Sequence, residues 1–177
     1  MKNCLDHTFE RLPRRSRSRM NSGYRRLQDT NIFQQVVGFT CVVCHLPINS
    51  DPLLSGVNNR NHCPYCLSSR HVDLYQAGDR MNACRASMKA IGLAWKSSRN
   101  KYGTTNGELM IVHLCDECDA VSINRIAADD NLEKLEDLFE KTLRMEKSRK
   151  VKLWEYGILL LEYHHQPELK QCLFGKT

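Results

Sequence analysis

Six of the nine cysteines in this chain of 177 residues form three CxxC pairs, a spacing with which two thiolates hold one metal ion. The pairs are Cys41/Cys44, Cys63/Cys66 and Cys115/Cys118. The first two pairs are separated by 18 residues, and two CxxC pairs at about this distance are typical of a four-thiolate zinc site. The regular spacing favours metal binding over disulfides and therefore indicates a reducing compartment.

The remaining ligands follow from counting, because two tetrahedral zinc sites need eight ligands. The three pairs and Cys84 supply seven, so one histidine is expected to complete the set. His45 and His62 each adjoin a paired cysteine and should point away from the metal. His71 lies in an irregular segment and is our first choice. His113, on the same face of an expected strand as the cysteine two residues later, is close behind.

The simplest assignment gives two structural zinc ions, each closed by four protein ligands. One site would take Cys41, Cys44, Cys63 and Cys66, and the other His71, Cys84, Cys115 and Cys118. A crossed pairing of the CxxC turns stays open. Closed sites leave no position for substrate, and no HExxH, deaminase or nucleophile motif is present. We therefore expect no enzyme activity and no small-molecule substrate.

Strands and turns should position these ligands. Residues 32–40 are expected to enter the first CxxC turn as a strand, and 67–83 to form a loop. Two further strands at 88–95 and 109–114 should flank an exposed hairpin tip at 96–107. The strand expected at 109–114 leads directly into the third CxxC turn.

Helices are expected after the metal region. Leucines at helical spacing predict an amphipathic helix over 131–147, capped by Asp129, Asp130 or Asn131. A second helix is predicted over 151–165, weakened at Gly157. The fold class is thus small α+β, with zinc-ribbon-like β-hairpins binding two zinc ions. We expect a basic extended arm at 1–30, a zinc-binding domain at 31–130 and a C-terminal helical extension at 131–177.

Positive charge is concentrated at the N-terminus. Residues 1–30 carry eight basic and three acidic side chains, which is +5 of the total net charge of +6. Arginine-rich arms commonly meet phosphate, because the guanidinium group binds it bidentately. The expected nucleic-acid contacts are Arg14, Arg15, Arg17, Arg19, Arg25, Arg26, Arg60, Arg99 and Lys101. Arg60 and Asn61 have an alternative role, which is to hold their own turn together.

The chain resembles the RNHCP domain family, whose name is spelled by Arg60–Pro64. Similar pieces follow in order over about residues 33–131, including Gly78-Asp79-Arg80, Asn124–Ala127 and Asp129-Asp130. The family's glycine after the last CxxC pair is Asp119 here. The resemblance implies a zinc-ribbon-type domain and no settled biochemical role.

These features together favour a zinc-binding, RNA-associated protein that is ribosome-bound or ribosomal, with rRNA and neighbouring ribosomal proteins as partners. The alternative is a protein–protein adaptor in transcription or translation, which docks through Trp154, Tyr156, Leu159 and Leu160 in the C-terminal helices. No apolar run is long enough to cross a membrane. We expect a cytoplasmic protein, with organellar import as a second possibility because the N-terminal residues are rich in arginine.

Overall fold

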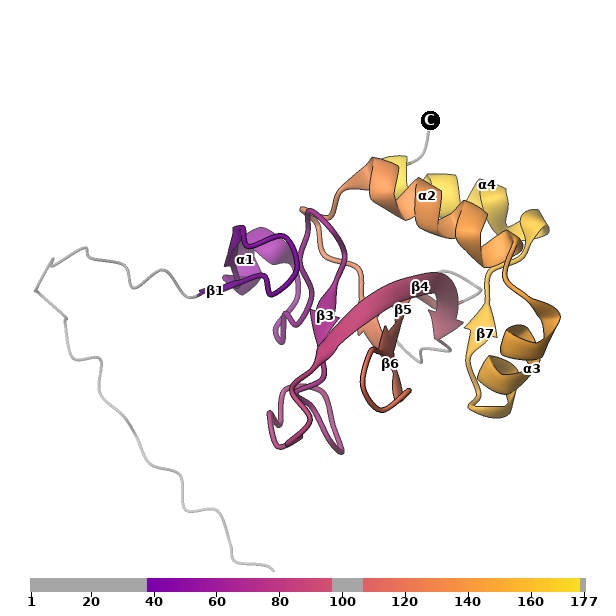
Figure 1. Cartoon of the computed structure of the whole chain (residues 1–177). Coiled ribbons are helices and arrows are strands. Elements are labelled where there is room, and N and C mark those ends of the chain that lie inside the picture. Colours follow the sequence, from indigo (N-terminus) through magenta and orange to yellow (C-terminus); the bar gives the residue numbers. More distant parts are fainter. Residues whose placement is uncertain (1–37, 97–106, 176–177) are drawn as a thin grey trace, which may run out of the picture. The chain divides into compact units, whose positions relative to one another are not determined.

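The structure is a computed structural model that describes residues 38–96 and 107–175 (Figure 1). The expected basic arm and almost all of the expected hairpin tip lie outside these residues. The elements, in chain order, are β1 (Gly38–Thr40), β2 (Pro47–Asn49), α1 (Pro52–Ser55), β3 (Ser69–Arg70), β4 (Ser87–Lys96), β5 (Glu108–Cys115), β6 (Val121–Arg125), α2 (Leu132–Leu143), α3 (Lys147–Glu155), β7 (Leu159–Leu160), a 3-10 helix (Tyr163–His165) and α4 (Gln166–Phe174). The expected small α+β class is confirmed.

Strand β4 is the centre of a five-stranded antiparallel sheet. Strand β5 pairs along one edge of β4, and β6 pairs with β5. The opposite edge of β4 is shared, because β3 pairs with its beginning and β7 with its end. A bulge between Ala90 and Gly92 interrupts the register with β5, and β4 is strongly curved in Figure 1. The first CxxC turn belongs to a separate hairpin formed by β1 and β2.

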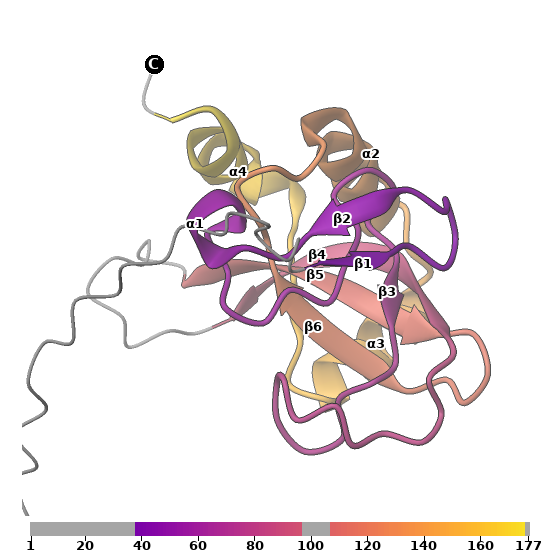
Figure 2. The same ribbon diagram turned by 90° about the vertical axis from the view of Figure 1, so that its left-hand side faces the viewer.

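The sheet separates two apolar clusters, because side chains alternate between the faces of a strand. On one face, Leu93 and Ile111 pack with Leu135 and Phe139 of α2 and with Leu169 of α4. On the other face, Ala94 and Val112 pack with Leu153 of α3. Figures 1 and 2 show α2 and α4 side by side and α3 away from them. Residues after 131 therefore contribute directly to the core of the sheet.

Helix α2 lies within the predicted range 131–147 but ends at Leu143, and the side chain of Asn131 accepts a hydrogen bond from the Lys134 amide as its N-cap. The single helix predicted over 151–165 is wrong. Helix α3 ends at Glu155, and Gly157 has a φ of 75°, the left-handed conformation that glycine commonly adopts just after a helix C-terminus. The following leucines then pair with the edge of β4. Among the described helices, none is long and apolar enough to cross a membrane.

Candidate metal centres

The three CxxC turns share one backbone geometry. The residue after each second cysteine has a positive φ, which is 60° at His45, 59° at Leu67 and 54° at Asp119. In each turn the amide of the first cysteine donates to the carbonyl five residues later, at 2.8–3.0 Å: Cys41 to Leu46, Cys63 to Ser68 and Cys115 to Ala120. The turn lets both thiols of a pair point to the same side. Asp119 adopts this geometry although glycine is the residue that favours it.

The first two CxxC turns bring four thiols together. Sγ of Cys41 lies 3.6 Å from Sγ of Cys66, and Sγ of Cys44 lies 3.5 Å from Sγ of Cys63. A disulfide would need a separation of about 2.05 Å. Sulfurs that share one zinc ion at about 2.3 Å lie about 3.8 Å apart at the corners of a tetrahedron. The four atoms all lie within 4.8 Å of one another, so this group could hold a metal ion.

The third CxxC turn forms a second group with Cys84 and His71. Sγ of Cys84 lies 3.7 Å from Sγ of Cys115 and 3.8 Å from Sγ of Cys118. Nδ1 of His71 lies 3.3 Å from Sγ of Cys118. One imidazole nitrogen and three thiols within 4.8 Å of one another make a donor set that suits zinc. Cys84 and Cys118 are exposed, whereas no thiol of the first group is.

The eight residues thus lie in the two groups of the simplest assignment, and the crossed pairing does not occur. His113, the second choice, lies elsewhere. It is buried, its Nε2 donates to the Leu67 carbonyl at 2.7 Å, and its Nδ1 accepts from the Asn124 amide at 3.0 Å. Burial lowers the pKa of His113 to about 3, so the ring stays neutral at physiological pH. His45 and His62 belong to neither group.

The partner of the His71 ring was not foreseen. The Asn82 side chain lies 2.7 Å from Nε2 of His71 and fixes the orientation of the ring. Asp73, only two residues after His71, is not the partner of the ring. The Asp73 carboxylate accepts instead from the backbone amides of Gly78 and Arg80. A local sequence pattern favours Asp73 because it is only two residues away, whereas Asn82 reaches the ring through the fold.

Thiolate formation is favoured at Cys41. Burial works against its charged form, but the amides of Cys44 and Val43 each donate to its Sγ at 3.4 Å and lower its pKa to about 7. Burial raises the pKa of Cys63 in the same group, so one thiol of the group ionises more readily than the other. A cation held between them would favour the thiolate form of both.

The motif Arg60–Pro64 is a buried hydrogen-bond network beside the first group. Nη1 of Arg60 donates to Asp129 at 2.7 Å, and Nη2 donates to Asp130 at 3.4 Å. Nε2 of His62 donates to the same Asp130 carboxylate at 2.8 Å. The Arg60 side chain is 0% exposed. Its buried charge is therefore paired within the protein.

The rest of the motif also has structural partners. The Asn61 amide donates to the Arg70 carbonyl at 3.0 Å, and its oxygen accepts from Arg80 at 2.9 Å. The Pro64 carbonyl accepts from the amide of Asn131, the residue that caps α2. The motif thus connects the first candidate metal group to β3 and to the beginning of α2.

The prediction that Arg60 contacts nucleic acid is wrong, because no part of its side chain is exposed. Its alternative role, holding the turn together, agrees with the network. The other expected nucleic-acid contacts lie outside the described residues: Arg14, Arg15, Arg17, Arg19, Arg25, Arg26, Arg99 and Lys101.

The chain is thus a small α+β domain that combines a curved antiparallel sheet with two groups of cysteine and histidine side chains, each of which could hold a metal ion. The sequence matches the RNHCP domain over residues 36–136, and the chain belongs to this family. The match covers all eight candidate ligands. No curated protein and no solved structure matches the chain.

Proposed function

We propose that the protein binds two structural zinc ions and associates with rRNA as a ribosome-bound or ribosomal component. The N-terminal arm is proposed as one RNA contact because it carries +5 of the net charge of +6. Two closed metal sites without a free coordination position favour a structural role over an enzymatic one.

The donor sets support zinc. The four separations between thiols given above, 3.5–3.8 Å, lie within a few tenths of an ångström of the tetrahedral value, and imidazole and thiolate are the ligands that zinc prefers. Cys41, Cys44, Cys63 and Cys66 would hold one ion, and His71, Cys84, Cys115 and Cys118 the other. The ions would fix the three CxxC turns and, through the last one, the end of β5.

Elemental analysis of the purified chain tests this part of the proposal. We expect two zinc ions per chain, and one in the variants Cys44→Ser and Cys84→Ser, because each removes a ligand of a different group. A double variant should contain none. Zinc-free wild-type protein that keeps its circular dichroism spectrum and its melting temperature would contradict the proposal.

The exposed surface of α3 is the observation that carries the RNA part. Residues 38–96 and 107–175 contain 15 basic and 17 acidic side chains, so their net charge is −2. Within them, basic side chains therefore indicate RNA binding only where they are concentrated on one surface. Helix α3 has such a concentration, with Lys147, Arg149, Lys150 and Lys152 against Glu155. Beside them, Trp154 is 67% and Tyr156 is 61% exposed. Basic side chains next to exposed aromatic rings suit phosphates and unpaired bases.

RNA binding at α3 is tested with the triple variant K147Q/R149Q/K152Q, which spares Lys150 because its Nζ donates to the Leu143 carbonyl. The matched control K134Q/K141Q/K170Q removes three exposed charges from α2 and α4. In filter binding with rRNA, we expect the triple variant to lose affinity and to depend less steeply on salt, because fewer counterions are released. The control should bind like the wild type.

The contribution of the arm is measured with a chain that lacks residues 1–30, by filter binding and by co-sedimentation with ribosomes in gradients. We expect weaker, less salt-sensitive binding. A full-length chain that shows no salt-sensitive association with RNA would overturn the proposed function.

A docking role is the second candidate, and one observation favours it. An open groove of about 780 Å³ lies between α3 and β7 and is lined by Trp95, Trp154, Leu159 and Leu160 among others. Nε1 of Trp95 is buried there without an acceptor among the described residues. A partner carbonyl or carboxylate would satisfy it. Ribosome association that survives nuclease treatment and is lost in Trp154→Ala would favour this candidate over RNA binding.

A further inference from the structure

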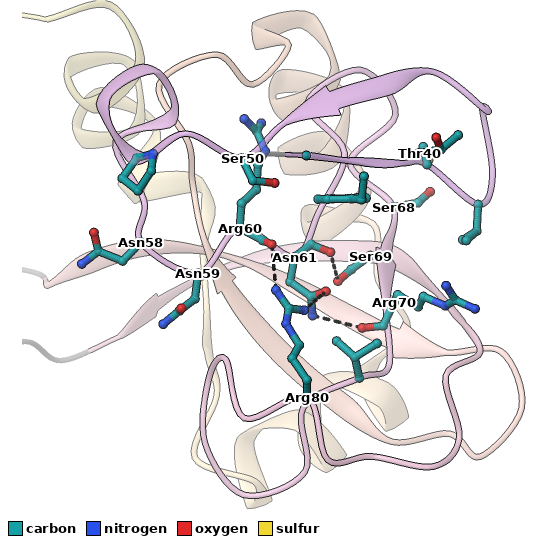
Figure 3. A pocket seen from close by; sticks show the side chains of 16 residues that line it. Thr40, Ser50, Asn58, Asn59, Arg60, Asn61, Ser68, Ser69, Arg70 and Arg80 are labelled. Carbon is teal, nitrogen blue, oxygen red and sulfur yellow. Dashed lines mark hydrogen bonds between the residues drawn. The ribbon is translucent and has the colours of Figure 1, made fainter. Parts of the chain in front are cut away.

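The pocket beside the family motif and the groove between α3 and β7 differ in the state of their polar groups. In the pocket, Figure 3 shows the Asn61 side chain bonded to the Arg70 carbonyl and to Arg80. The Arg80 guanidinium also donates to the Arg60 carbonyl and pairs with Asp73. The groove, in contrast, contains the buried Nε1 of Trp95, which has no acceptor among the described residues. A buried donor without a partner marks a place where a ligand would be stabilised.

The outer edge of β7 faces this groove with unpaired backbone groups. The register pairs Leu160 with Ala94 of β4, and the next amide along, that of Leu161, donates to the Leu93 carbonyl at 3.0 Å. Hydrogen-bonded and non-hydrogen-bonded pairs alternate in an antiparallel ladder, so Leu160 belongs to a non-hydrogen-bonded pair. Its amide and carbonyl therefore point away from β4, and neither has a partner within 38–96 and 107–175. The consecutive residues 158–165 line the groove.

These unpaired groups match an extended polypeptide. The edge of β7 presents one donor and one acceptor at Leu160, and Trp95 adds a second donor nearby, since its side chain lies on the same face as that of Leu159 opposite it. A strand offers backbone amides and carbonyls along its edge, whereas a helix uses its own internally. Addition of a strand to an open sheet edge is one of the recurring ways in which proteins bind peptides.

The side chains around the edge indicate the composition of such a segment. Four apolar side chains that line the groove are each more than half exposed: Val151, Trp154, Leu159 and Tyr163. Lys150 lines the wall formed by α3, and Lys147 lies one turn earlier on the same side of the helix. Neither lysine forms an ion pair within the described part of the chain. The carboxylate in the lining, that of Glu162, lies 3.5 Å from His164.

We propose that the groove binds an extended segment of a partner protein, which adds a strand to the outer edge of β7. Its backbone bonds the Leu160 amide and carbonyl, and one of its oxygens accepts from Nε1 of Trp95. The segment is apolar and carries an acidic residue on the side of α3. This inference rests on the docking role, the second candidate function, and adds the mode of binding and the chemistry of the partner.

A pair of variants isolates the backbone contact. Leu160→Pro removes the outward N–H without removing a hydrogen bond to β4, and proline is tolerated where the N–H of an edge strand faces away from its neighbour. Leu160→Ala is the matched control, because it also shortens the side chain but keeps the N–H. Zinc content and melting temperature show that both variants are folded.

The probe is selected from random twelve-residue peptides displayed on phage, with the full zinc-loaded chain as the target. We expect the selected peptides to combine β-branched or aromatic residues with aspartate or glutamate. The tightest of them, made synthetically, should bind Leu160→Pro about tenfold more weakly than Leu160→Ala, since one hydrogen bond is lost. A version with lysine in place of its acidic residues should bind the wild type more weakly.

Nuclear magnetic resonance of the ¹⁵N-labelled chain locates the peptide. We expect the peptide to shift the indole signal of Trp95 and to slow hydrogen exchange at the Leu160 amide. The chain has two tryptophans, so Trp95→Phe assigns the indole signal. A ten-nucleotide single-stranded RNA of mixed sequence is the comparison and should leave exchange at Leu160 unchanged.

The results separate this inference from the docking role. If the peptide shifts the Trp95 signal but binds the proline and alanine variants equally, strand addition is overturned and docking at the groove stands. If the peptide binds as expected while ribosome association is unaffected by Trp154→Ala, strand addition stands and the docking role in translation fails.

Three further results would overturn strand addition by a partner protein. The first is a selection that enriches no peptide bound at the groove. The second is an RNA that slows exchange at the Leu160 amide, because the groove would then take RNA. The third is a dimer in analytical ultracentrifugation that Leu160→Pro abolishes and Leu160→Ala does not, because a second copy of this chain would then occupy the edge.

Discussion

Asp130 receives both charged side chains of the family motif, Arg60 and His62, and also the amide of Ala127. The carboxylate is buried and lies 70 positions after the arginine that it binds. This contact joins Asp130 to Arg60 and His62 of the motif across a long stretch of the chain. The motif and the two aspartates are parts of one buried network that positions the first candidate metal group against α2.

The variant Asp130→Asn should lower the free energy of unfolding by about 3 kcal/mol, because it leaves the buried charge of Arg60 without its buried counter-charge. Asp129→Asn is the matched control. Its carboxylate is 43% exposed, so the loss should be about 1 kcal/mol or less. Urea unfolding of the zinc-loaded protein measures both. Equal losses would mean that the two carboxylates are interchangeable partners.

The turn at Asp119 provides another prediction for a single residue. Its φ of 54° is a conformation that glycine adopts freely and that β-branched residues avoid. We expect Asp119→Gly to leave the free energy of unfolding unchanged or to raise it by up to about 1 kcal/mol, and Asp119→Val to lower it by about 1–2 kcal/mol. Thermal unfolding at fixed zinc concentration checks this order. A more stable valine variant would contradict the geometry.

At the scale of elements, Gly157 decides between two arrangements of the C-terminal segment. In the structure it ends α3 with a φ of 75°, so Gly157→Ala should lower the free energy of unfolding by about 1 kcal/mol. In a continuous helix over 151–165, the same change would raise it by about 1 kcal/mol. The sign of the change in urea unfolding therefore distinguishes the two. The exposed substitution Gln171→Ala in α4 serves as a control for helix propensity alone.

The elements that the sequence predicts well are those whose signal is local. Strands β4 and β5 have long apolar runs, and helix α2 has leucines at helical spacing. In the CxxC turns, the motif itself identifies the cysteines as candidate ligands. Strands β3 and β7 have two residues each and exist because they pair with β4. Such pairing depends on residues far away in the chain, so a reading of local periodicity misses these strands.

In the candidate site, too, the sequence predicts what depends on local signals and misses what depends on distant residues. The two groups of ligands follow from spacing and from a count of coordination positions. The roles of Arg60 and Asn82 do not, because an arginine in a short motif has the same sequence signal whether it faces RNA or a buried carboxylate. The burial of the Arg60 guanidinium and its contacts with Asp129 and Asp130 show that this arginine faces buried carboxylates.

At the scale of the whole molecule, the two candidate sites differ in access. Cys84 and Cys118 are exposed, whereas Cys41 and Cys63 are buried. If both groups hold zinc, an excess of a coloured chelator should remove it in two phases, with the second group losing its ion first. The variant Cys84→Ser should lack the fast phase and keep the slow one. A fast phase that persists in this variant would assign it to the first group.

Charge is unevenly placed on the two helices that lie on opposite faces of the sheet. Helix α2 carries Glu133, Glu136, Asp137 and Glu140 against Lys134 and Lys141, and α3 carries four basic side chains against one acid. The sheet between them thus separates opposite charges and gives this body an electric dipole. Near a polyanion, the electric field would orient the molecule before contact, with α3 facing the polyanion and α2 facing away from it. The orientation of the first encounter would then be set at long range, by helix composition, before any base is contacted.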